Sequence, residues 1–397
     1  MTGCGFRRGL VVAQYISSMS ATGSTRSRIG IVESLSGPLV SIGAVLLAFL
    51  CGALMIVALG ADPWAGFKAL LDGAFGGRAE LADTAVKATP LLLVGTGICI
   101  SFRARVINIG GEGQILAGAT VSTVAALGLG DLPRVVLVPV VLVAGLVGGG
   151  AWGAIPGALK AYLGVNEILS TIMLNIVAVQ VVNYLLRDPL IDPAGRDGAI
   201  PQTERLSPHA DLPILLGGTR LNLGFVVAVL VAVAASIFLW RTSTGYRLRA
   251  VGASADAARY AGMPVRRMTT LALTLSGATC GLAGSILVFG SEAHRFVTDG
   301  SSTGFTGSAG FNGIVAALFG GLHPLWTIPA SVLFGGLLVG ANAMQRAIQV
   351  PASLVIALNG LVVIFVVASN DVRRRVNRAV EVREERRRHD AAVVTPS

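Results

Sequence analysis

Charged side chains are scarce in this sequence. Asp, Glu, Lys and Arg make up only 13% of its 397 residues, whereas soluble domains carry about 25%. The few charges gather near the N-terminus, at Arg103 and Arg105, between Arg241 and Arg267, and after Asp371, and long apolar runs separate these groups. Runs of about 20 apolar residues can cross the hydrocarbon core of a bilayer. The composition therefore excludes an ordinary soluble domain and predicts an all-α, polytopic integral membrane protein.

Residues for nucleotide, metal and catalytic chemistry are equally few. The three lysines lie outside any Gly-Lys-Ser/Thr phosphate loop, which excludes that means of binding ATP. The four histidines are isolated and none has metal-ligand spacing, while the four cysteines lack paired spacing and are expected to be inert packing residues. We therefore expect no catalytic residue, metal or cofactor in this chain, and an intramembrane enzyme is poorly supported.

The basic excess has a different meaning in a membrane protein than in a soluble one. The net charge is +10, but the arginines lie at the ends of apolar runs and in the C-terminal tail, without a run of interleaved aromatic residues. That arrangement argues against a nucleic-acid partner. It indicates topology signals and contact with anionic membrane lipid.

Glycine is abundant, with 51 residues, although it weakens isolated helices in water. In lipid, small residues allow membrane helices to approach each other closely. Three sets of glycines at a spacing of four predict such contacts. They are Gly145, Gly149, Gly153 and Gly157; Gly277 and Gly281; and Gly336 and Gly340.

Apolar runs bounded by Pro, Gly and charged residues predict about ten transmembrane helices. The expected spans are 39–60, 88–101, 109–128, 135–156, 166–186, 223–240, 268–290, 309–322, 325–345 and 352–369. Two of them, 88–101 and 309–322, would form only about 21 Å of helix at 1.5 Å per residue, so we expect them to break or re-enter. The second to fifth spans would begin outside and the seventh to tenth inside, so the pattern predicts an inverted repeat, as in transporters.

The distribution of Lys and Arg predicts the orientation of these spans. With the N-terminus inside, 21 of the 31 Lys and Arg residues lie on the inner side, so the positive-inside rule places both termini in the cytoplasm. We expect a cytoplasmic tail at 1–38, a transmembrane domain at 39–370 and a basic cytoplasmic tail at 371–397. This last tail is interpreted as a solvated helix, with a lipid-surface anchor as the alternative.

Polar residues interrupt the apolar pattern at the start of the third span, in the sequence Asn108-Ile-Gly-Gly-Glu-Gly-Gln114. A carboxylate one turn into a membrane helix is costly unless it faces protein or water. Asn108, Glu112 and Gln114 are therefore candidates for a translocation pathway. The alternative is that Glu112 and Gln114 only hold a helix N-terminus, where the helix dipole favours negative charge.

A second set of polar residues begins and follows the fifth span. Its members are Asn166, Glu167, Thr171, Asn175 and Asn183. Thr171, Asn175 and Asn183 fall roughly on one helical face. Such a stripe indicates a lumen-facing side, with interhelical hydrogen bonding as the alternative. Asn312, which opens the short span 309–322, is a further pathway candidate, although a solvated loop is the favoured interpretation.

A short cytoplasmic helix is predicted between the sixth and seventh spans, at about 252–262. Ser254 suits its N-cap, Gly262 suits the position after its end, and Pro264 prevents its continuation. A helix of about two turns is unstable alone in water, so it must dock on a partner. The residues expected to form this contact are Gly252, Ala257, Ala258, Arg259, Tyr260 and Gly262. A helix lying on the membrane interface is the alternative.

These segments together resemble a known family. The segment Ala-Ala-Arg-Tyr-Ala-Gly262, followed by Leu-Ser-Gly-Ala-Thr-Cys-Gly-Leu-Ala-Gly284, looks like the coupling region of bacterial ABC importer permeases of the branched-chain amino acid and simple sugar superfamily. Asn108-Ile-Gly-Gly-Glu-Gly-Gln is similar to that family's Asn-x-Gly-x-Glu-Gly-Gln signature. The segments Asn166-Glu-Ile-Leu-Ser-Thr-Ile-Met-Leu-Asn175 and Ala343-Met-Gln-Arg346 resemble its nucleoside and simple sugar branch. The resemblance covers about residues 40–370 and leaves the two tails outside it.

The resemblance implies a permease subunit of an ATP-driven importer in the bacterial plasma membrane. It implies three protein partners: a second homologous permease subunit, an extracytoplasmic substrate-binding lipoprotein, and a cytoplasmic ATPase with two nucleotide-binding cassettes that grips the coupling helix. The expected solute is an uncharged nucleoside, since the spans offer amides and hydroxyls rather than paired charges. A simple sugar or a branched-chain amino acid is the alternative solute. An ion-coupled secondary transporter is the rival class, because it too has broken helices and inverted repeats.

Overall fold

The computed structural model describes residues 50–193, 201–298, 300–301 and 304–351, and the single residues 43, 46, 47, 357, 360, 361, 364 and 365. The chain divides into two compact units, one formed by Met1–Gly60 with Ile356–Ser397 and the other by Ala61–Val355. In the first unit residues 50–58 are helical, within the predicted span 39–60. The predicted tails, 1–38 and 371–397, and most of the predicted span 352–369 lie outside the described residues.

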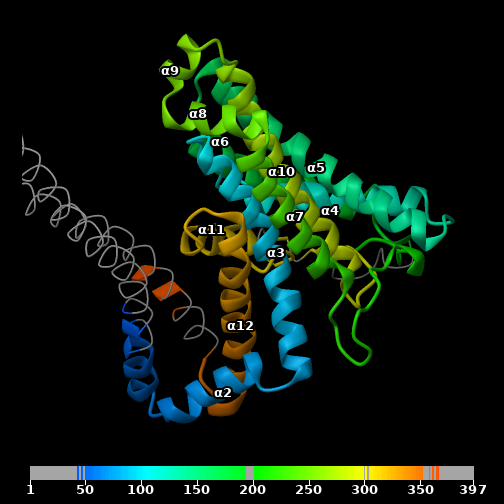
Figure 1. The fold of residues 1–397 in the computed structure, drawn as a ribbon. Helices are drawn as coiled ribbons and strands as arrows, with labels where there is room; N and C mark the ends of the chain where they lie inside the picture. The colour runs from blue at the N-terminus through cyan, green and yellow to red at the C-terminus, as the bar shows by residue number, and fades with distance from the viewer. Residues whose placement is uncertain are drawn as a thin grey trace, which may run out of the picture. The chain divides into compact units, whose positions relative to one another are not determined.

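The unit Ala61–Val355 is helical, as predicted, through its described part (Figure 1). Its elements in chain order are α2 (Pro63–Phe75), α3 (Arg78–Arg103), α4 (Gly111–Gly128), α5 (Arg134–Leu163), α6 (Glu167–Arg187), the 3-10 turn η2 (Pro208–Ala210), α7 (Leu223–Arg241), α8 (Ser243–Ala253), α9 (Ala255–Tyr260), α10 (Val265–Phe289), α11 (Ala309–Phe319) and α12 (Pro324–Ile348).

Six of these helices are long and apolar enough to cross a bilayer, namely α3, α5, α6, α7, α10 and α12. Each coincides in place with a predicted span. The predicted spans 109–128 and 309–322 correspond to α4, with 18 residues, and α11, with 11 residues, so the second of them is short as expected. The helices are those of a multi-pass membrane protein, and the total of ten spans stays a prediction.

The prediction of a short span at 88–101 was wrong. α3 runs for 26 residues, and the charged residues Glu80, Asp83 and Lys87 occupy its first turns rather than a loop. Pro90 lies inside the helix. Because proline has no backbone N–H, one hydrogen bond of the helix is missing there, and the helix nevertheless continues. An apolar run therefore measures the apolar part of a helix and not its length.

Two helices outside the predicted spans are not indicated by hydropathy. One is α2, in which Asp62 caps the N-terminus by accepting the N–H of Trp64 at 2.9 Å. α2 crosses α12 closely, because Gly340 lies against the carbonyl oxygen of Leu70 and leaves no room for a side chain. The other is α8, which directly precedes α9.

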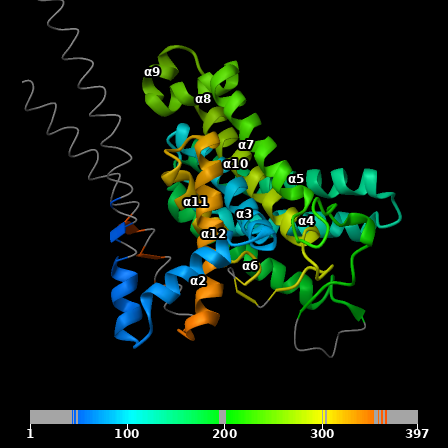
Figure 2. The same cartoon turned by 60° about the horizontal axis from the view of Figure 1, so that its bottom comes forward.

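The glycine stripe of α5 makes a close helix contact, and its partner is α10. A Cβ atom on Gly149 would meet the carbonyl oxygen of Gly277 and the Cα of Gly281. Gly118 of α4 is in equally close contact with the backbone of Gly281. Because backbone meets backbone here, α4, α5 and α10 form one tightly packed group (Figures 1 and 2).

One end of this unit carries the basic residues between Arg241 and Arg267, together with Arg103, Arg105 and Lys160, and we call it the basic end. There the start of α10 meets the end of α5, since Thr270 Oγ1 donates to the carbonyl oxygen of Gly157 at 3.3 Å. Likewise the end of α3 meets the turn before α12, since Arg103 Nη2 donates to the carbonyl oxygen of Leu322 at 3.1 Å. α8 and α9 lie at this end (Figure 1). The grouping agrees with the segments predicted to face the cytoplasm.

The described segments 188–193, 201–222 and 290–298 lie at the opposite end, and the first two pair with the third. Thr203 N donates to the carbonyl oxygen of Phe296 at 3.1 Å. Arg295 forms an ion pair with Asp192 at 2.6 Å, and His294 lies 2.8 Å from Asp211. These contacts tie the connection between α6 and α7 to the end of α10.

Candidate functional site

The segment 108–114 connects α3 to α4 and is closed by a pair of carboxamides. Asn108 Nδ2 donates to Gln114 Oε1 at 2.9 Å, and Gln114 Nε2 donates back to Asn108 Oδ1 at 3.1 Å. Asn108 Nδ2 also donates to Ser276 Oγ of α10 at 2.8 Å. Both amides are buried, with exposures of 0% and 1%. Because buried amides need hydrogen-bond partners, this network fixes the segment against α10.

Asn175 of α6 holds the N-terminus of α4. Its Oδ1 accepts the backbone N–H of Gly113 at 2.8 Å, and its Nδ2 donates to the carbonyl oxygen of Ile109 at 3.0 Å. The first N–H groups of a helix have no acceptor within the helix, and Gly110, the N-cap of α4, has no side chain to supply one. Asn175 therefore acts as an N-cap contributed by a second helix.

Glu112 holds the N-terminus of α11 in the same way. Its Oε1 accepts the backbone N–H of Phe311 at 3.3 Å, and the ends of the two helices approach most closely at Gly310. The N-cap residue of α11, Ser308, has a left-handed backbone and makes no side-chain cap. Glu112 is 1% exposed, and a buried carboxylate is costly unless such donors and a helix dipole stabilise it.

The N-termini of α4 and α11 thus meet at one junction. A Cβ atom on Gly111 would lie 3.1 Å from the Cα of Gly310, so glycine on both sides permits the approach. Each helix N-terminus carries about half a positive charge, and the Glu112 carboxylate lies between them. The carboxylate therefore faces two partly positive helix ends inside the buried junction. The two helices occupy corresponding places in the predicted inverted repeat.

Two further pathway candidates lie beside this junction. Thr171 is one turn before Asn175 on α6, is buried, and donates to the carbonyl oxygen of Glu167 at 2.7 Å. Asn312 lies in the first turn of α11, next to Phe311, and is half-buried. The structure therefore places six of the nine predicted pathway residues in one region.

The other three candidates lie away from the junction. Asn166 caps α6 by accepting the N–H of Ile168 at 2.9 Å. Glu167 forms an ion pair with Lys160 at 2.7 Å, which joins the start of α6 to the end of α5. Asn183, two turns beyond Asn175, donates to the carbonyl oxygen of Gly300 at 3.3 Å. These contacts are compatible with a structural role, and a pathway role for all nine residues stays a prediction.

Within the predicted segment 252–262 the structure has α9 at Ala255–Tyr260, while Gly252 belongs to the end of α8. Ser254 Oγ accepts the N–H of Ala257 at 3.3 Å, Gly262 has a φ of +74°, and Pro264 precedes α10. The cap, the stop and the break predicted from the sequence are therefore confirmed. α8 ends at Ala253 and α9 begins at Ala255. Only Ser254 separates the two helices, so no flexible linker joins them.

The residues expected to contact a partner divide between two faces of this segment. Ala257, Arg259 and Tyr260 are exposed, Tyr260 to 95%. Ala258 is instead buried at 4% and packs against Val251 and Met268. Gly262 is exposed. Gly252 instead lies against the backbone of Arg103 at the end of α3. α9 thus offers one polar and aromatic face and is held to the chain by the other.

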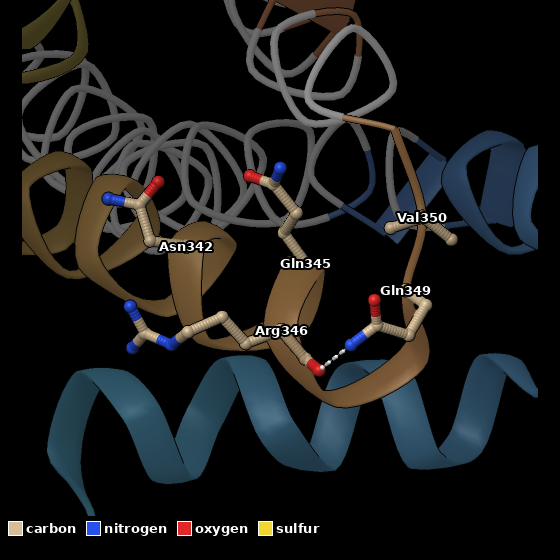
Figure 3. A pocket seen from close by; sticks show the side chains of 5 residues that line it. All are labelled: Asn342, Gln345, Arg346, Gln349 and Val350. Atoms are coloured by element: carbon tan, nitrogen blue, oxygen red, sulfur yellow. Dashed lines mark hydrogen bonds between the residues drawn. The ribbon is translucent and has the colours of Figure 1, made fainter.

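A polar pocket of about 310 Å³ lies at the last turns of α12 (Figure 3). Asn342, Gln345 and Arg346 line it from one helical face, together with Gln349 and Val350. Gln349 Nε2 donates to the carbonyl oxygen of Arg346 at 2.9 Å. Carboxamides and a guanidinium can hydrogen bond to the base edges and hydroxyls of a neutral polar solute. Within the described ranges, no three His, Cys, Asp or Glu residues gather as they would around a metal ion.

Several residues that build the site are not identified by sequence reasoning. Ser276 accepts from Asn108 across 168 positions of chain, and Phe311 donates to Glu112 across 199. Neither residue has a local signal, because a serine or a phenylalanine in an apolar helix is ordinary. Gly310 offers a weak signal, since a glycine just inside a helix often permits a close approach.

The model of a family described as "Branched-chain amino acid transport system / permease component" matches residues 80–367. This range includes the junction of α4 and α11, the segment α8–α9 and the pocket of α12.

Three similar proteins cover nearly the same range. The chain is 36% identical over 346 residues to the guanosine ABC transporter permease protein NupP of Bacillus subtilis, covering 86% of this chain and 96% of that protein. It is 31% identical over 333 residues to the nucleoside ABC transporter permease protein NupB of Lactococcus lactis, covering 83% and 90%. It is 34% identical over 340 residues to the glucose ABC transporter permease protein TsgB13 of Haloferax volcanii, covering 83% and 87%.

Proposed function

The chain belongs to the family of branched-chain amino acid transport permease components, and from this premise we propose that it is the membrane subunit of an ATP-driven importer for nucleosides. The observation that carries the proposal is its similarity, over most of both chains, to two permeases named for guanosine and nucleosides.

The proposed importer has four kinds of component. This chain and a second, homologous permease form the membrane part, and both termini of this chain face the cytoplasm of a bacterial cell. An extracytoplasmic lipoprotein delivers the solute, and a cytoplasmic ATPase with two cassettes supplies the energy. The absence of a Gly-Lys-Ser/Thr loop in this chain agrees with ATP binding by a partner.

In this proposal α9 is the coupling helix. Its exposed Arg259 and Tyr260 dock on the ATPase, while buried Ala258 holds α9 against Val251 and Met268. Arg259 lies 3.7 Å from Asp256, and both side chains are largely solvent-exposed, so this ion pair contributes little stability and leaves Arg259 available to a partner. Closure of the ATPase cassettes pushes on α9, and α8 moves with it. The membrane helices then tilt and open the pathway alternately to each side of the membrane.

Co-purification tests this assembly directly. The tagged chain is extracted from its own membranes in mild detergent, and each protein that accompanies it is identified by mass. The proposal predicts an ATPase with two cassettes and a second, related permease. Isolation of the chain alone, under conditions in which other importers stay whole, would favour the secondary-transporter class instead.

The Arg259→Glu variant tests the role of α9 within the complex. The reversed charge leaves the buried side of α9 intact, so membrane insertion and expression are expected to match the parent chain. Solute uptake is expected to uncouple from ATP hydrolysis. Normal uptake by this variant would contradict the coupling assignment.

A simple sugar is the second candidate solute, because one of the similar permeases is named for glucose. The two candidates are separated by competition. Uptake of labelled guanosine that is suppressed by unlabelled nucleosides and not by glucose supports the nucleoside assignment. The reverse pattern supports the sugar.

A further inference from the structure

The indole of Trp240, near the end of α7, contacts side chains of three other segments at the basic end. The guanidinium of Arg103, the last residue of α3, lies 5.2 Å from the centre of its ring. The guanidinium of Arg249 in α8 lies 5.8 Å from it. The imidazole of His323, the N-cap of α12, lies 4.4 Å away at an interplanar angle of 30°. One side chain thus joins α3, α7, α8 and α12.

The Arg249 contact connects this cluster to the coupling helix. Arg249 lies in α8, and Ser254 both ends α8 and caps α9. Because the two helices share this residue, a displacement of α9 moves α8. Arg249 Nε is buried and has no hydrogen-bond partner among the described residues, and its guanidinium lies over the attractive face of the Trp240 ring.

The Arg103 contact connects the cluster to both halves of the membrane domain. Nε and Nη2 of Arg103 donate to the carbonyl oxygen of Leu322 at 3.2 Å and 3.1 Å. Leu322 has a φ of +56° and lies in the turn between α11 and α12. On its other side Arg103 ends α3, five residues before Asn108 of the junction. A shift of Arg103 therefore acts on the segments leading to α4 and to α12.

The charges of the cluster are also informative. Among the described residues neither Arg103 nor Arg249 forms an ion pair with a carboxylate. A ring face attracts a guanidinium without the fixed hydrogen-bond geometry of a carboxylate. Arg249 can therefore change its position over the ring while contact is kept, as a moving connection requires.

We propose that Trp240 is a positioning residue that transmits displacement of the coupling helix, through Arg249 and Arg103, to the helices that form the α4–α11 junction. This inference rests on the proposed function. It adds to it a particular route, through one aromatic ring, by which ATP hydrolysis in the partner is coupled to movement of the membrane helices.

The test uses the complete importer reconstituted in liposomes, with guanosine uptake and ATP hydrolysis measured on the same sample. Trp240→Leu removes the ring face, and Trp240→Phe retains one. Trp326→Leu is the matched control, because Trp326 lies at the same end in the first turn of α12 and is 67% exposed. For Trp240→Leu we expect the number of solutes transported per ATP to fall by about three- to tenfold, while basal hydrolysis is kept.

Rescue separates coupling from packing. Trp240→Phe is expected to recover most of the transport ratio, and Trp326→Leu to leave it unchanged. A normal ratio in Trp240→Leu, or equal losses in Trp240→Leu and Trp240→Phe, would overturn the proposal. If Trp240→Leu fails to assemble, Arg249→Gln is the second variant. It is expected to lower the number of solutes transported per ATP without changing basal hydrolysis, and a normal ratio in it would overturn the proposal. Absence of ATP-driven uptake in the parent complex would reject the proposed function instead.

Discussion

Gly252 of α8 packs directly against the carbonyl oxygen of Arg103 at the end of α3. A Cβ atom at position 252 would overlap this oxygen and crowd the carbonyl carbon of Ala104. The contact joins the segment before the coupling helix to the segment that leads to Asn108, so two regions far apart in the sequence share one backbone contact. α8 is therefore linked to α3 in two ways, directly through this backbone contact and indirectly through the ring of Trp240.

Gly252→Ala is therefore expected to destabilise the protein. Alanine in a helix gains about 1 kcal/mol over glycine, but the displacement needed to relieve a clash with backbone costs about 1–3 kcal/mol, so we expect a net loss. Thermal unfolding in detergent measures it. Gly128→Ala is the control, because a Cβ atom there meets nothing within 4 Å. A variant at position 252 as stable as this control would contradict the close contact.

Replacement of Glu112 separates capping from ion coupling. Glu112→Ala leaves the N–H of Phe311 without its acceptor, and we expect a loss of about 1–3 kcal/mol of stability. Glu112→Gln keeps an acceptor oxygen and is expected to lose less. In an ATP-driven importer, uptake by Glu112→Gln remains driven by ATP when ion gradients are collapsed. Selective loss of gradient-driven uptake in this variant would instead support a secondary transporter.

Asn175 is expected to require both halves of its carboxamide. Asn175→Asp keeps the acceptor for the N–H of Gly113 but places a second oxygen against the carbonyl oxygen of Ile109. Asn175→Ala removes both bonds. We expect each variant to lose about 1–3 kcal/mol, since buried polar backbone groups are left unpaired. Chemical denaturation of the purified chain checks this, and Asn183→Ala, on a more exposed part of the helix, is expected to cost less.

His323 predicts a dependence of stability on pH. Its Nδ1 accepts the N–H of Leu325 at 3.2 Å, which requires that nitrogen to be unprotonated. Burial, and secondly the Arg103 guanidinium, lower the pKa of His323 below its ordinary value of 6.5. Because the unfolded chain then binds the proton more readily, this contribution to stability is fully present above 6.5 and is lost as the pH falls from 6.5 through the lower folded pKa.

His323→Asn isolates this effect, because asparagine caps a helix well and does not titrate. Thermal unfolding temperatures at pH 7.5 and pH 5.5 are compared for both proteins. The parent chain is expected to lose more stability on acidification than the variant. Equal losses in the two proteins would show that His323 does not titrate against the fold in this range.

Local chemistry accounts for the parts that the sequence predicted well. A cap at Ser254, a left-handed stop at Gly262 and a proline at 264 act within a few residues, so the ends of α9 follow from the pattern alone. The glycines of α5 and α10 likewise predicted a close contact, although not which glycines would face each other.

The remaining features depend on contacts between distant segments. The start of α3 includes Glu80, Asp83 and Lys87, because tertiary packing allows a helix to continue beyond its apolar run. Whether Glu112 caps its own helix or another depends on where α11 lies, and this position is set by packing across 199 residues of chain. The Trp240 cluster forms only where four segments converge. From the sequence alone, its arginines indicate only the orientation of the spans.

The most direct test of the account is guanosine uptake into proteoliposomes that contain the purified complex with its binding protein. ATP is enclosed on the side of the ATPase, and proton and sodium gradients are collapsed by ionophores. We predict accumulation of guanosine that depends on hydrolysable ATP and stops when a non-hydrolysable analogue replaces it. Uptake that persists without ATP and disappears with the ion gradients would contradict the account.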